Sequence, residues 1–281
     1  YTGMNNGSKL NFKVRLYGID LVTEALYYDM KVPFDAMAEL PEGSRERHLI
    51  CNYLDRACMF IDYRKHRLGG FRDSVKEALK YMREEFYAKE CANTNKNELA
   101  LIGHTHIDVA WLWTLAQTEE KAQRSFSTVI RLMEKYPEYL FMSSQPQLYD
   151  YVKKNDPKLY EKIKARIKEG RWEAEGSMWL ESDTNLISGE SLVRQILLGK
   201  KFMKEEFGIE NKSLWLPDVF GYSAALPQIL KKSNVPQFFT AKISWCETNK
   251  FPHDNFIWQG IDGSEVFAVL SETYVKRLDP K

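Results

Sequence analysis

The sequence predicts an α/β fold with a largely parallel sheet, and two observations lead to this expectation. After residue 98, short apolar runs alternate with longer stretches whose apolar residues recur at helical spacing. Because strands that alternate with helices are typical of βαβ units, we expect a β/α barrel or an open doubly wound sheet. The chain has 281 residues, of which 44% are hydrophobic, and this is enough for one large α/β domain with or without a smaller companion.

Residues 1–95 are predicted to form a mostly helical segment. Apolar residues follow three- and four-residue steps through residues 44–64 and again through residues 71–87. Ser74 and Glu77 have the spacing of a capping box, so a helix is expected to begin near Ser74. The polar stretch that follows this segment is expected to be a linker or a loop.

The second part of the chain is predicted in finer detail. The expected strands cover residues 99–104, 139–144, 171–177, 213–218 and 237–242, with two more around the turn within 255–270. The expected helices cover residues 118–137, 148–170, 189–208 and 223–234. Asp156 and Pro157 are expected to divide the second of these helices, because a residue before proline disfavours helical geometry.

Composition excludes several classes of partner. The formal net charge of +1 gives no electrostatic reason to bind nucleic acid or an anionic membrane. The longest apolar runs fall well short of the ~18 residues that a membrane-spanning helix needs. The four cysteines lack CxxC spacing, so we expect buried thiols of a reducing compartment.

The stretch "GHTHIDVAW" places unusual residues where a strand is expected to end. Chemistry in parallel α/β folds gathers at the carboxyl ends of strands. In an extended segment His104, His106 and Asp108 lie on one side of the chain. Imidazole and carboxylate are ligand types of a catalytic zinc site, although such residues at a strand end also serve as ordinary hydrogen-bonding groups. Trp111 is placed to form a flat apolar wall beside them.

A second strand end, "LWLPDVFGYSAALP", contributes another acid. Pro217 cannot donate to a sheet ladder, which fits a strand terminus, and Asp218 follows it. If the strands are parallel, Asp218 lies at the same edge of the sheet as His106 and Asp108, where the carboxyl ends of the strands meet. From the residues alone, Asp218 is a candidate metal ligand, a candidate nucleophile, or both.

Five segments in order give the chain a resemblance to a known family. They are "HTHIDVAWLW", "GRWEAEGSMWLESDTN", "SGESLVRQ", "LWLPDVFGYSAALPQIL" and "FIWQGIDGSEV". Together they resemble the amino-terminal half of glycoside hydrolase family 38 α-mannosidases, in the branch that holds cytosolic and many bacterial enzymes. The resemblance implies a (β/α)7-type barrel with parallel strands, preceded by the helical segment. It also implies that residues 96–281 are a catalytic barrel domain, truncated at its C-terminal end.

The resemblance also implies roles for individual residues. His106, Asp108 and Asp218 match the ligands of one Zn²⁺, and Asp218 matches the catalytic nucleophile of a retaining mechanism. Trp111 matches an aromatic residue that stacks on the sugar. Lys242 matches a basic residue near the nucleophile, and His104 is expected beside the ligands, where it packs or donates a hydrogen bond.

Two parts of the family's site have no match in this sequence. The acid/base aspartate and a last zinc-ligating histidine belong to later segments of the family, so we expect the fragment alone to bind zinc poorly and to lack activity. Asp262 and His253 are expected to be turn or loop residues and not these missing groups.

Three acids after the third expected strand are further candidates for lining the pocket. They are Glu175, Glu181 and Asp183, of which two are expected to bond only to loop backbone. Arg194 on the following helix is expected to pair with one of the three.

Two other classes of function stay open at this point. One is a metal-dependent amidohydrolase or carbohydrate deacetylase, which also uses histidines at strand ends. The other is a carbohydrate-binding fragment without catalysis. The first choice is a zinc-dependent, retaining α-mannosidase in the cytoplasm that acts on mannose-containing oligosaccharides. We expect no nucleic-acid or membrane partner, and a homo-oligomer remains open.

Overall fold

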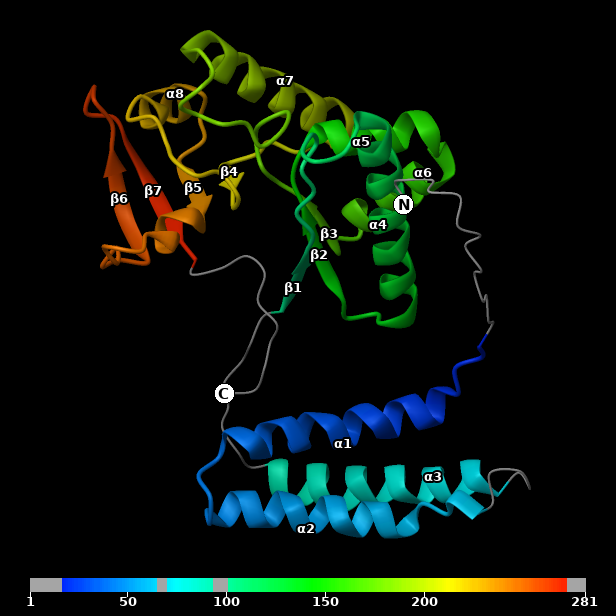
Figure 1. Cartoon of the computed structure of the whole chain (residues 1–281). Helices are drawn as coiled ribbons and strands as arrows, with labels where there is room; N and C mark the ends of the chain where they lie inside the picture. Colours follow the sequence, from blue (N-terminus) through cyan, green and yellow to red (C-terminus); the bar gives the residue numbers. More distant parts are fainter. Residues whose placement is uncertain (1–16, 65–69, 93–100, 272–281) are drawn as a thin grey trace, which may run out of the picture. The chain divides into compact units, whose positions relative to one another are not determined.

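A computed structural model of the chain describes residues 17–64, 70–92 and 101–271, and they fall into two compact units. We call residues 17–64 and 70–92 the helical unit, and residues 101–271 the sheet unit (Figure 1). Each is described by itself. Among the helices that the structure describes, none has the length and apolar character needed to cross a bilayer.

The helical unit has helices in residues 44–64 and 71–87, where the periodicity predicts them, and a further helix before them. They are α1 (Leu21–Glu39), α2 (Arg45–Phe60), α3 (Phe71–Tyr81) and η2 (Met82–Cys91), the last wound as a π-helix. Side chains of Asp20 and Ser44 accept hydrogen bonds from the first turns of α1 and α2. The predicted capping box is wrong, because α3 begins after Gly70 and the Ser74 hydroxyl donates to the carbonyl of Phe71.

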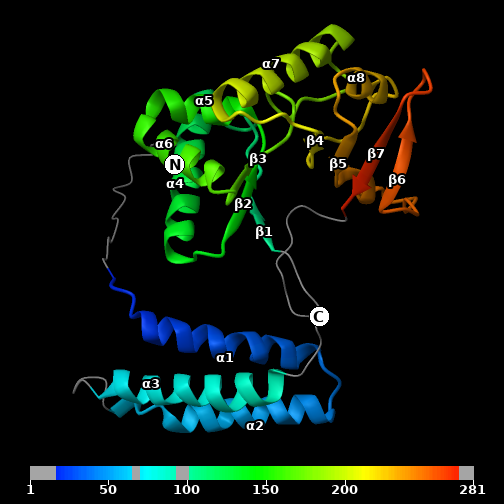
Figure 2. The same ribbon diagram turned by 180° about the vertical axis from the view of Figure 1, so that it is seen from behind.

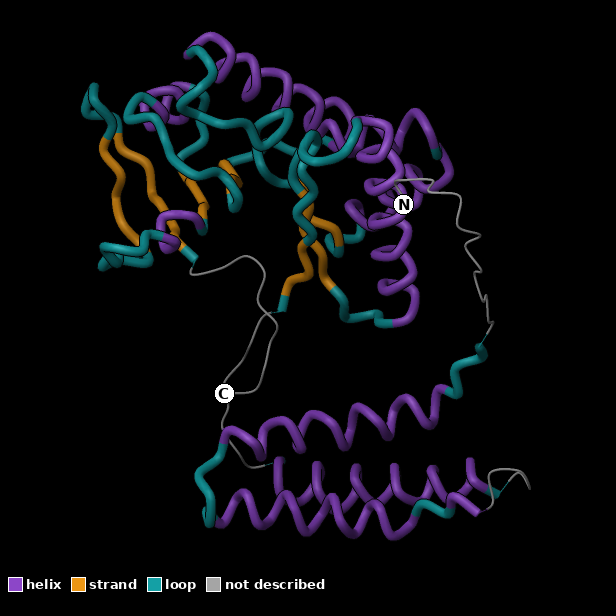
Figure 3. Tube along the Cα trace, viewed as in Figure 1, coloured by secondary structure: helices purple, strands orange, loops and turns teal. Residues whose placement is uncertain are grey.

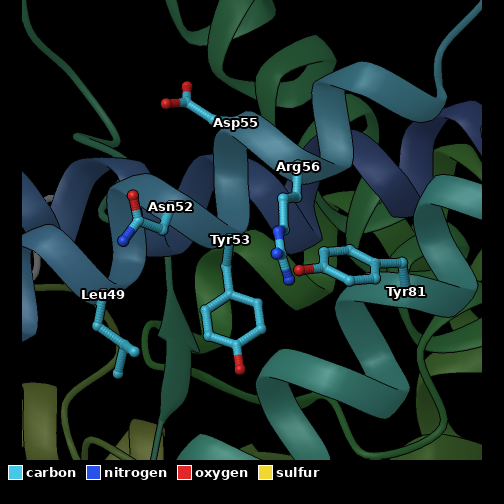
Figure 4. A pocket seen from close by; sticks show the side chains of 6 residues that line it. All are labelled: Leu49, Asn52, Tyr53, Asp55, Arg56 and Tyr81. Atoms are coloured by element: carbon cyan, nitrogen blue, oxygen red, sulfur yellow. The ribbon is translucent and has the colours of Figure 1, made fainter.

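A cavity of about 520 Å³ lies in the helical unit. Its lining residues are Leu49, Asn52, Tyr53, Asp55, Arg56 and Tyr81 (Figure 4). The Arg56 side chain points toward the Tyr81 hydroxyl, and the Tyr53 hydroxyl donates to Glu90. One aspartate and one arginine among tyrosines do not make a metal or nucleophile site.

The strands of the sheet unit form two sheets. The first contains β1 (Ile102–His104), β2 (Leu140–Ser143) and β3 (Trp172–Ala174), all parallel. The second has the order β4 (Ser213–Leu216), β5 (Gln237–Thr240), β7 (Glu265–Leu270) and β6 (Asn255–Gln259), and only β6 is antiparallel. Figure 3 shows the strands in orange. A single parallel bridge between Gly176 and Leu214 joins the chain after β3 to β4. The α/β class and all seven strands are as predicted, but the described strands form two sheets and not one closed ring.

Helices connect the strands in the expected order. They are α4 (Leu115–Lys135), α5 (Pro146–Asn155), α6 (Pro157–Lys168), α7 (Gly189–Phe207), α8 (Leu226–Lys232) and the short 3₁₀-helix η3 (Lys242–Trp245). Helices α4, α5 and α6 lie on one side of the first sheet, and α8 lies near β7 (Figure 2). The break at Asp156 is confirmed, since this residue ends α5 and caps α6. Helix α4 begins earlier than predicted, at a capping box of Thr114 and Gln117.

Aromatic packing fixes β3 against the helices. Trp172 is fully buried, and its indole N–H donates to the Tyr149 hydroxyl over 2.8 Å. The rings of Phe126 and Phe141 meet the Trp172 ring at centroid distances of 5.1 and 4.7 Å. This core sets the position of the segment that follows β3, which carries Glu181.

The four cysteines are free thiols, as expected. The expectation that they are buried is wrong, because Cys51, Cys58 and Cys246 are exposed and Cys91 is partly exposed.

Candidate metal centre

Two strand ends bring the candidate residues together. β1 ends at His104, and the loop after it carries His106 and Asp108. β4 ends at Leu216, and Pro217 and Asp218 follow it. His104 and Trp215 link the two strands, because the Trp215 indole N–H donates to Nε2 of His104 over 3.2 Å. The carboxyl ends of β1 and β4 therefore lie close to each other, although the two strands belong to different sheets.

One imidazole and two carboxylates form a compact cluster at this edge. A ligand atom from each of His106, Asp108 and Asp218 lies within 4.8 Å of the other two. Nε2 of His106 is 2.9 Å from Oδ1 of Asp108 and 3.2 Å from Oδ2 of Asp218. Imidazole nitrogen and carboxylate oxygen are both ligand types that protein zinc sites use. The three predicted ligands are thus close enough to hold one divalent ion.

Glu181 approaches the same imidazole from its other edge. Its Oε2 lies 3.0 Å from Nδ1 of His106, and its side chain is only 5% exposed. Burial alone would lower the pKa of His106, but the hydrogen bonds and charges of Glu181 and Asp108 outweigh it and raise that pKa to about 9. Burial raises the pKa of Glu181, and His106 opposes this rise. The sequence signal for Glu181 was its position after a strand, which did not reveal its contact with His106.

Lys242 pairs with the second oxygen of Asp218. The ammonium contacts Oδ1 of Asp218, and the Lys242 side chain is 3% exposed. Nζ also lies 3.2 Å from the ring centroid of Trp245 and 4.5 Å from that of Phe220. A fully desolvated ammonium needs such partners. Lys242 therefore lies at the candidate nucleophile, with the two oxygens of Asp218 facing a cation and an imidazole.

His104, which was expected to pack or donate a hydrogen bond beside the ligands, contacts Trp215. Its ring packs on Trp215 at a centroid distance of 5.2 Å, and its Nε2 accepts a hydrogen bond instead of donating one. Burial, together with the charge of His106, lowers the pKa of His104 to about 4. Neutral His104 therefore carries its proton on Nδ1.

Trp111 is the predicted site residue that the structure does not bring into the cluster. It lies in the loop after Asp108, and 63% of it is exposed. Within the described part of the chain its ring meets the edge of Trp113 at 5.1 Å. Its exposed ring is available to a ligand.

The remaining acids near the site serve the backbone. One Glu175 oxygen accepts hydrogen bonds from the backbone N–H groups of Gly176 and Ser213. Asp183 accepts from the two backbone N–H groups of residues 185 and 186. Glu175 also has a hydrogen bond with the Asn211 side chain, so the expectation of acids that bond only to loop backbone fits Asp183 and not Glu175.

Other expectations have mixed outcomes. Arg194 was expected to pair with a pocket acid, which is wrong, because it pairs with Glu190 one turn away on α7. Asp262 accepts hydrogen bonds from Ser264 in the turn between β6 and β7, as expected. His253 is an exposed loop residue, also as expected.

Known proteins resemble this chain over most of its length. The family model described as Glycosyl hydrolases family 38 N-terminal domain matches residues 96–278. Alpha-mannosidase G from Dictyostelium discoideum is 38% identical over 261 residues, which cover 91% of this chain and 23% of that protein. Alpha-mannosidase 2C1 from Homo sapiens is 47% identical over 166 residues, which cover 59% of this chain and 16% of that protein. The chain thus spans less than a quarter of the length of these relatives.

A solved structure is similar in fold. The crystal structure of an alpha-mannosidase from Enterococcus faecalis V583 has a TM-score of 0.54 and 24% identity, covering 60% of this chain and 19% of that chain. At this identity the likeness shows the fold alone. The family model, in contrast, matches more than half of the sequence, and the chain belongs to glycosyl hydrolase family 38.

Proposed function

We propose that this chain supplies the nucleophile and most of the zinc site of a retaining α-mannosidase, which removes terminal α-mannosyl residues from oligosaccharides. The observation that carries the proposal is the convergence of His106, Asp108 and Asp218 from two distant strand ends. Family membership and the names of the relatives give the substrate class. The parallel strands, joined by the Gly176–Leu214 bridge, support a place in a (β/α)7 barrel. The free cysteines fit a cytoplasmic location.

His106, Asp108 and Asp218 are the residues that would hold the metal. They supply neutral imidazole and carboxylate donors, and they leave coordination positions for a substrate. When bound, Zn²⁺ would orient adjacent sugar hydroxyls and stabilise negative charge on them. Bound by these residues, the metal would favour mannose through a contact with its axial hydroxyl.

Asp218 is the proposed nucleophile. Its carboxylate attacks the anomeric carbon while the glycosidic bond breaks, and the leaving oxygen takes a proton from a second carboxyl group. Water then cleaves the resulting glycosyl ester of Asp218, and mannose leaves with its configuration retained. The Lys242 ammonium stabilises Asp218 in the charged form that the attack needs.

Two further residues are proposed to contact or orient the reactants. Trp111 offers its exposed ring to a sugar face. His104, held by Trp215, packs beside the ligands and keeps a neutral group next to His106. Neither role needs His104 or Trp111 to bind the metal.

The test uses the full-length polypeptide that carries this sequence, loaded with zinc. Asp218→Asn should lower the hydrolysis of an aryl α-mannoside by roughly 10⁴-fold or more, because the attacking group is lost. Asp262→Asn, the same change in an exposed turn, is the matched control and should leave the rate unchanged. NMR of the first sugar product should show retained configuration. An unchanged rate in Asp218→Asn, or release of acetate or ammonia from an acylated or aminated substrate, would contradict the proposal.

A further inference from the structure

The imidazole of His106 is held from both edges. Nε2 faces Asp108 and Asp218, and Nδ1 lies 3.0 Å from Oε2 of Glu181. The Glu181 carboxylate therefore lies opposite the nitrogen that faces the metal cluster, and it does not belong to the three-residue ligand set. A buried carboxylate in this position needs a reason, because removing its charge from water is costly.

Glu181 is fixed in this position by its neighbours. The Ser144 hydroxyl donates to Oε1 of Glu181 over 2.8 Å, so each carboxylate oxygen has its own partner. The backbone N–H of Glu181 donates to Oε1 of Gln145 over 3.2 Å. The Gln145 amide in turn donates to the carbonyl of Ile107, between the two ligands of the first strand end. Gln145 therefore connects Glu181 by hydrogen bonds to the loop that carries His106 and Asp108.

Close packing keeps Ser144 in reach of Glu181. Gly176 has a φ of 137°, and a Cβ at this position would lie 2.7 Å from Cβ of Ser144. Only glycine permits this approach without a shift of the backbone. The segment after β2 and the segment after β3 therefore meet where the carboxylate is anchored.

The chemistry of histidine gives this contact a specific consequence. A metal binds the imidazole nitrogen that has a free lone pair, so only one neutral tautomer of His106 can be a ligand through Nε2. A carboxylate that accepts a hydrogen bond from Nδ1–H stabilises that tautomer, fixes the plane of the ring and makes Nε2 more basic.

We propose that Glu181 is a positioning residue for the metal centre: its carboxylate accepts the Nδ1–H of His106 and so presents Nε2 to a zinc ion held with Asp108 and Asp218. The proposal rests on the proposed function, in which these three residues bind zinc. A purely structural ion pair between two loops would contribute to fold stability but would leave zinc affinity unchanged.

The experiment measures the affinity for Zn²⁺ of the full-length polypeptide that carries this sequence, by competition with a chromophoric chelator. Glu181→Gln should weaken binding about tenfold, and Glu181→Leu about a hundredfold, because the amide oxygen can still accept a hydrogen bond and leucine cannot. Glu175→Gln is the matched control, since Glu175 is a partly buried acid whose hydrogen bonds come from two backbone N–H groups and the Asn211 side chain, and not from His106. Its zinc affinity should stay within about twofold. Denaturant unfolding of each variant separates a loss of fold stability from a loss of zinc affinity.

A second readout follows His106 directly. Nitrogen NMR of histidine-labelled, zinc-loaded chain should show a protonated Nδ1 and a metal-bound Nε2, and Glu181→Leu should lose this pattern. Ser144→Ala, a mild change that frees one oxygen of Glu181, should weaken zinc binding by a few-fold and decides the question if the Glu181 variants do not fold.

The possible outcomes separate the two proposals. If folded Glu181→Leu and Ser144→Ala bind zinc as the unsubstituted chain does, the role of Glu181 is wrong and the zinc site stands. If the unsubstituted full-length polypeptide binds no zinc, both proposals fail.

Discussion

Charged residues are arranged differently in the two units. In the helical unit, Lys76 pairs with Asp73 at the surface, where half of the lysine side chain is exposed. In the sheet unit, Lys242 and Glu181 are almost completely buried against Asp218 and His106. Exposed pairs contribute little to stability, whereas burying charged groups has a desolvation cost that pairing only partly offsets. The comparison indicates that chemistry, and not stability, explains the charges at the sheet edge.

The largest effect should come from removing the buried ammonium. Lys242→Met leaves Asp218 without its cation, and we expect the free energy of unfolding to fall by about 3 kcal/mol. Lys76→Met, the same change at the surface of the helical unit, should have no measurable effect. Urea unfolding of the two variants makes the comparison. Equal effects would show that burial does not distinguish the two ion pairs.

The free energy of unfolding should depend on pH through His104 and His106, because the fold lowers the pKa of His104 and raises the pKa of His106. Protonated His106 stabilises the fold fully below its ordinary pKa of 6.5, and this contribution is lost as the pH rises through about 9. Neutral His104 stabilises the fold above pH 6.5, and this contribution is lost as the pH falls toward 4. Each contribution is on the order of 3 kcal/mol.

The measurement is urea unfolding of the chain between pH 4 and pH 10 with a chelator present. His106→Gln should remove the alkaline loss and keep the acid one, and His104→Gln should do the reverse. If both variants keep the profile of the unsubstituted chain, the buried imidazoles are not responsible for it.

A smaller loss of stability is expected where alanine replaces a glycine of positive φ. Two such glycines differ in whether an added Cβ would meet a neighbouring residue. Gly176→Ala is expected to cost about 2–3 kcal/mol, because a positive φ is combined with the contact to Ser144. Gly43, in the helical unit, also has a positive φ of 81°, but a Cβ there meets nothing within 4 Å. Gly43→Ala should therefore cost about 1 kcal/mol. Thermal unfolding of both variants tests this, and an equal cost would mean that Ser144 moves aside freely.

The periodic parts of the fold could be predicted from the sequence. Strands β1 to β7 follow short apolar runs, and α7 follows a long amphipathic pattern, so hydrophobic spacing alone located them. The capping box predicted at Ser74 is wrong because the helix already begins at Phe71, after Gly70, so that Ser74 lies inside its first turn. Local caps depend on loop geometry that spacing does not encode.

The site was predictable only in part, because its contacts join distant segments. His106, Asp108 and Asp218 could be proposed from their places at strand ends. The contacts of Glu181 with His106 and of Arg194 with Glu190 depend on side-chain directions that one sequence does not give. Burial of the Lys242 ammonium between Trp245 and Phe220 likewise appears only after folding.

The smallest effect on stability is expected from replacing the exposed residue Trp111. Its neighbour Trp113 donates to Thr118 and lies under the ammonium of Lys121, whereas Trp111 is 63% exposed. Trp111→Ala should change the free energy of unfolding by less than about 0.5 kcal/mol. In the full-length polypeptide it should raise KM for an aryl mannoside about tenfold, because a stacking surface is lost.

Trp113→Ala is the control for this last prediction, because it removes the packed ring of the same pair and should destabilise the loop. If Trp111→Ala destabilises the chain as much as Trp113→Ala and leaves KM unchanged, Trp111 packs and does not bind sugar. The opposite result, an unchanged stability with a raised KM, would support contact between the exposed ring of Trp111 and the substrate.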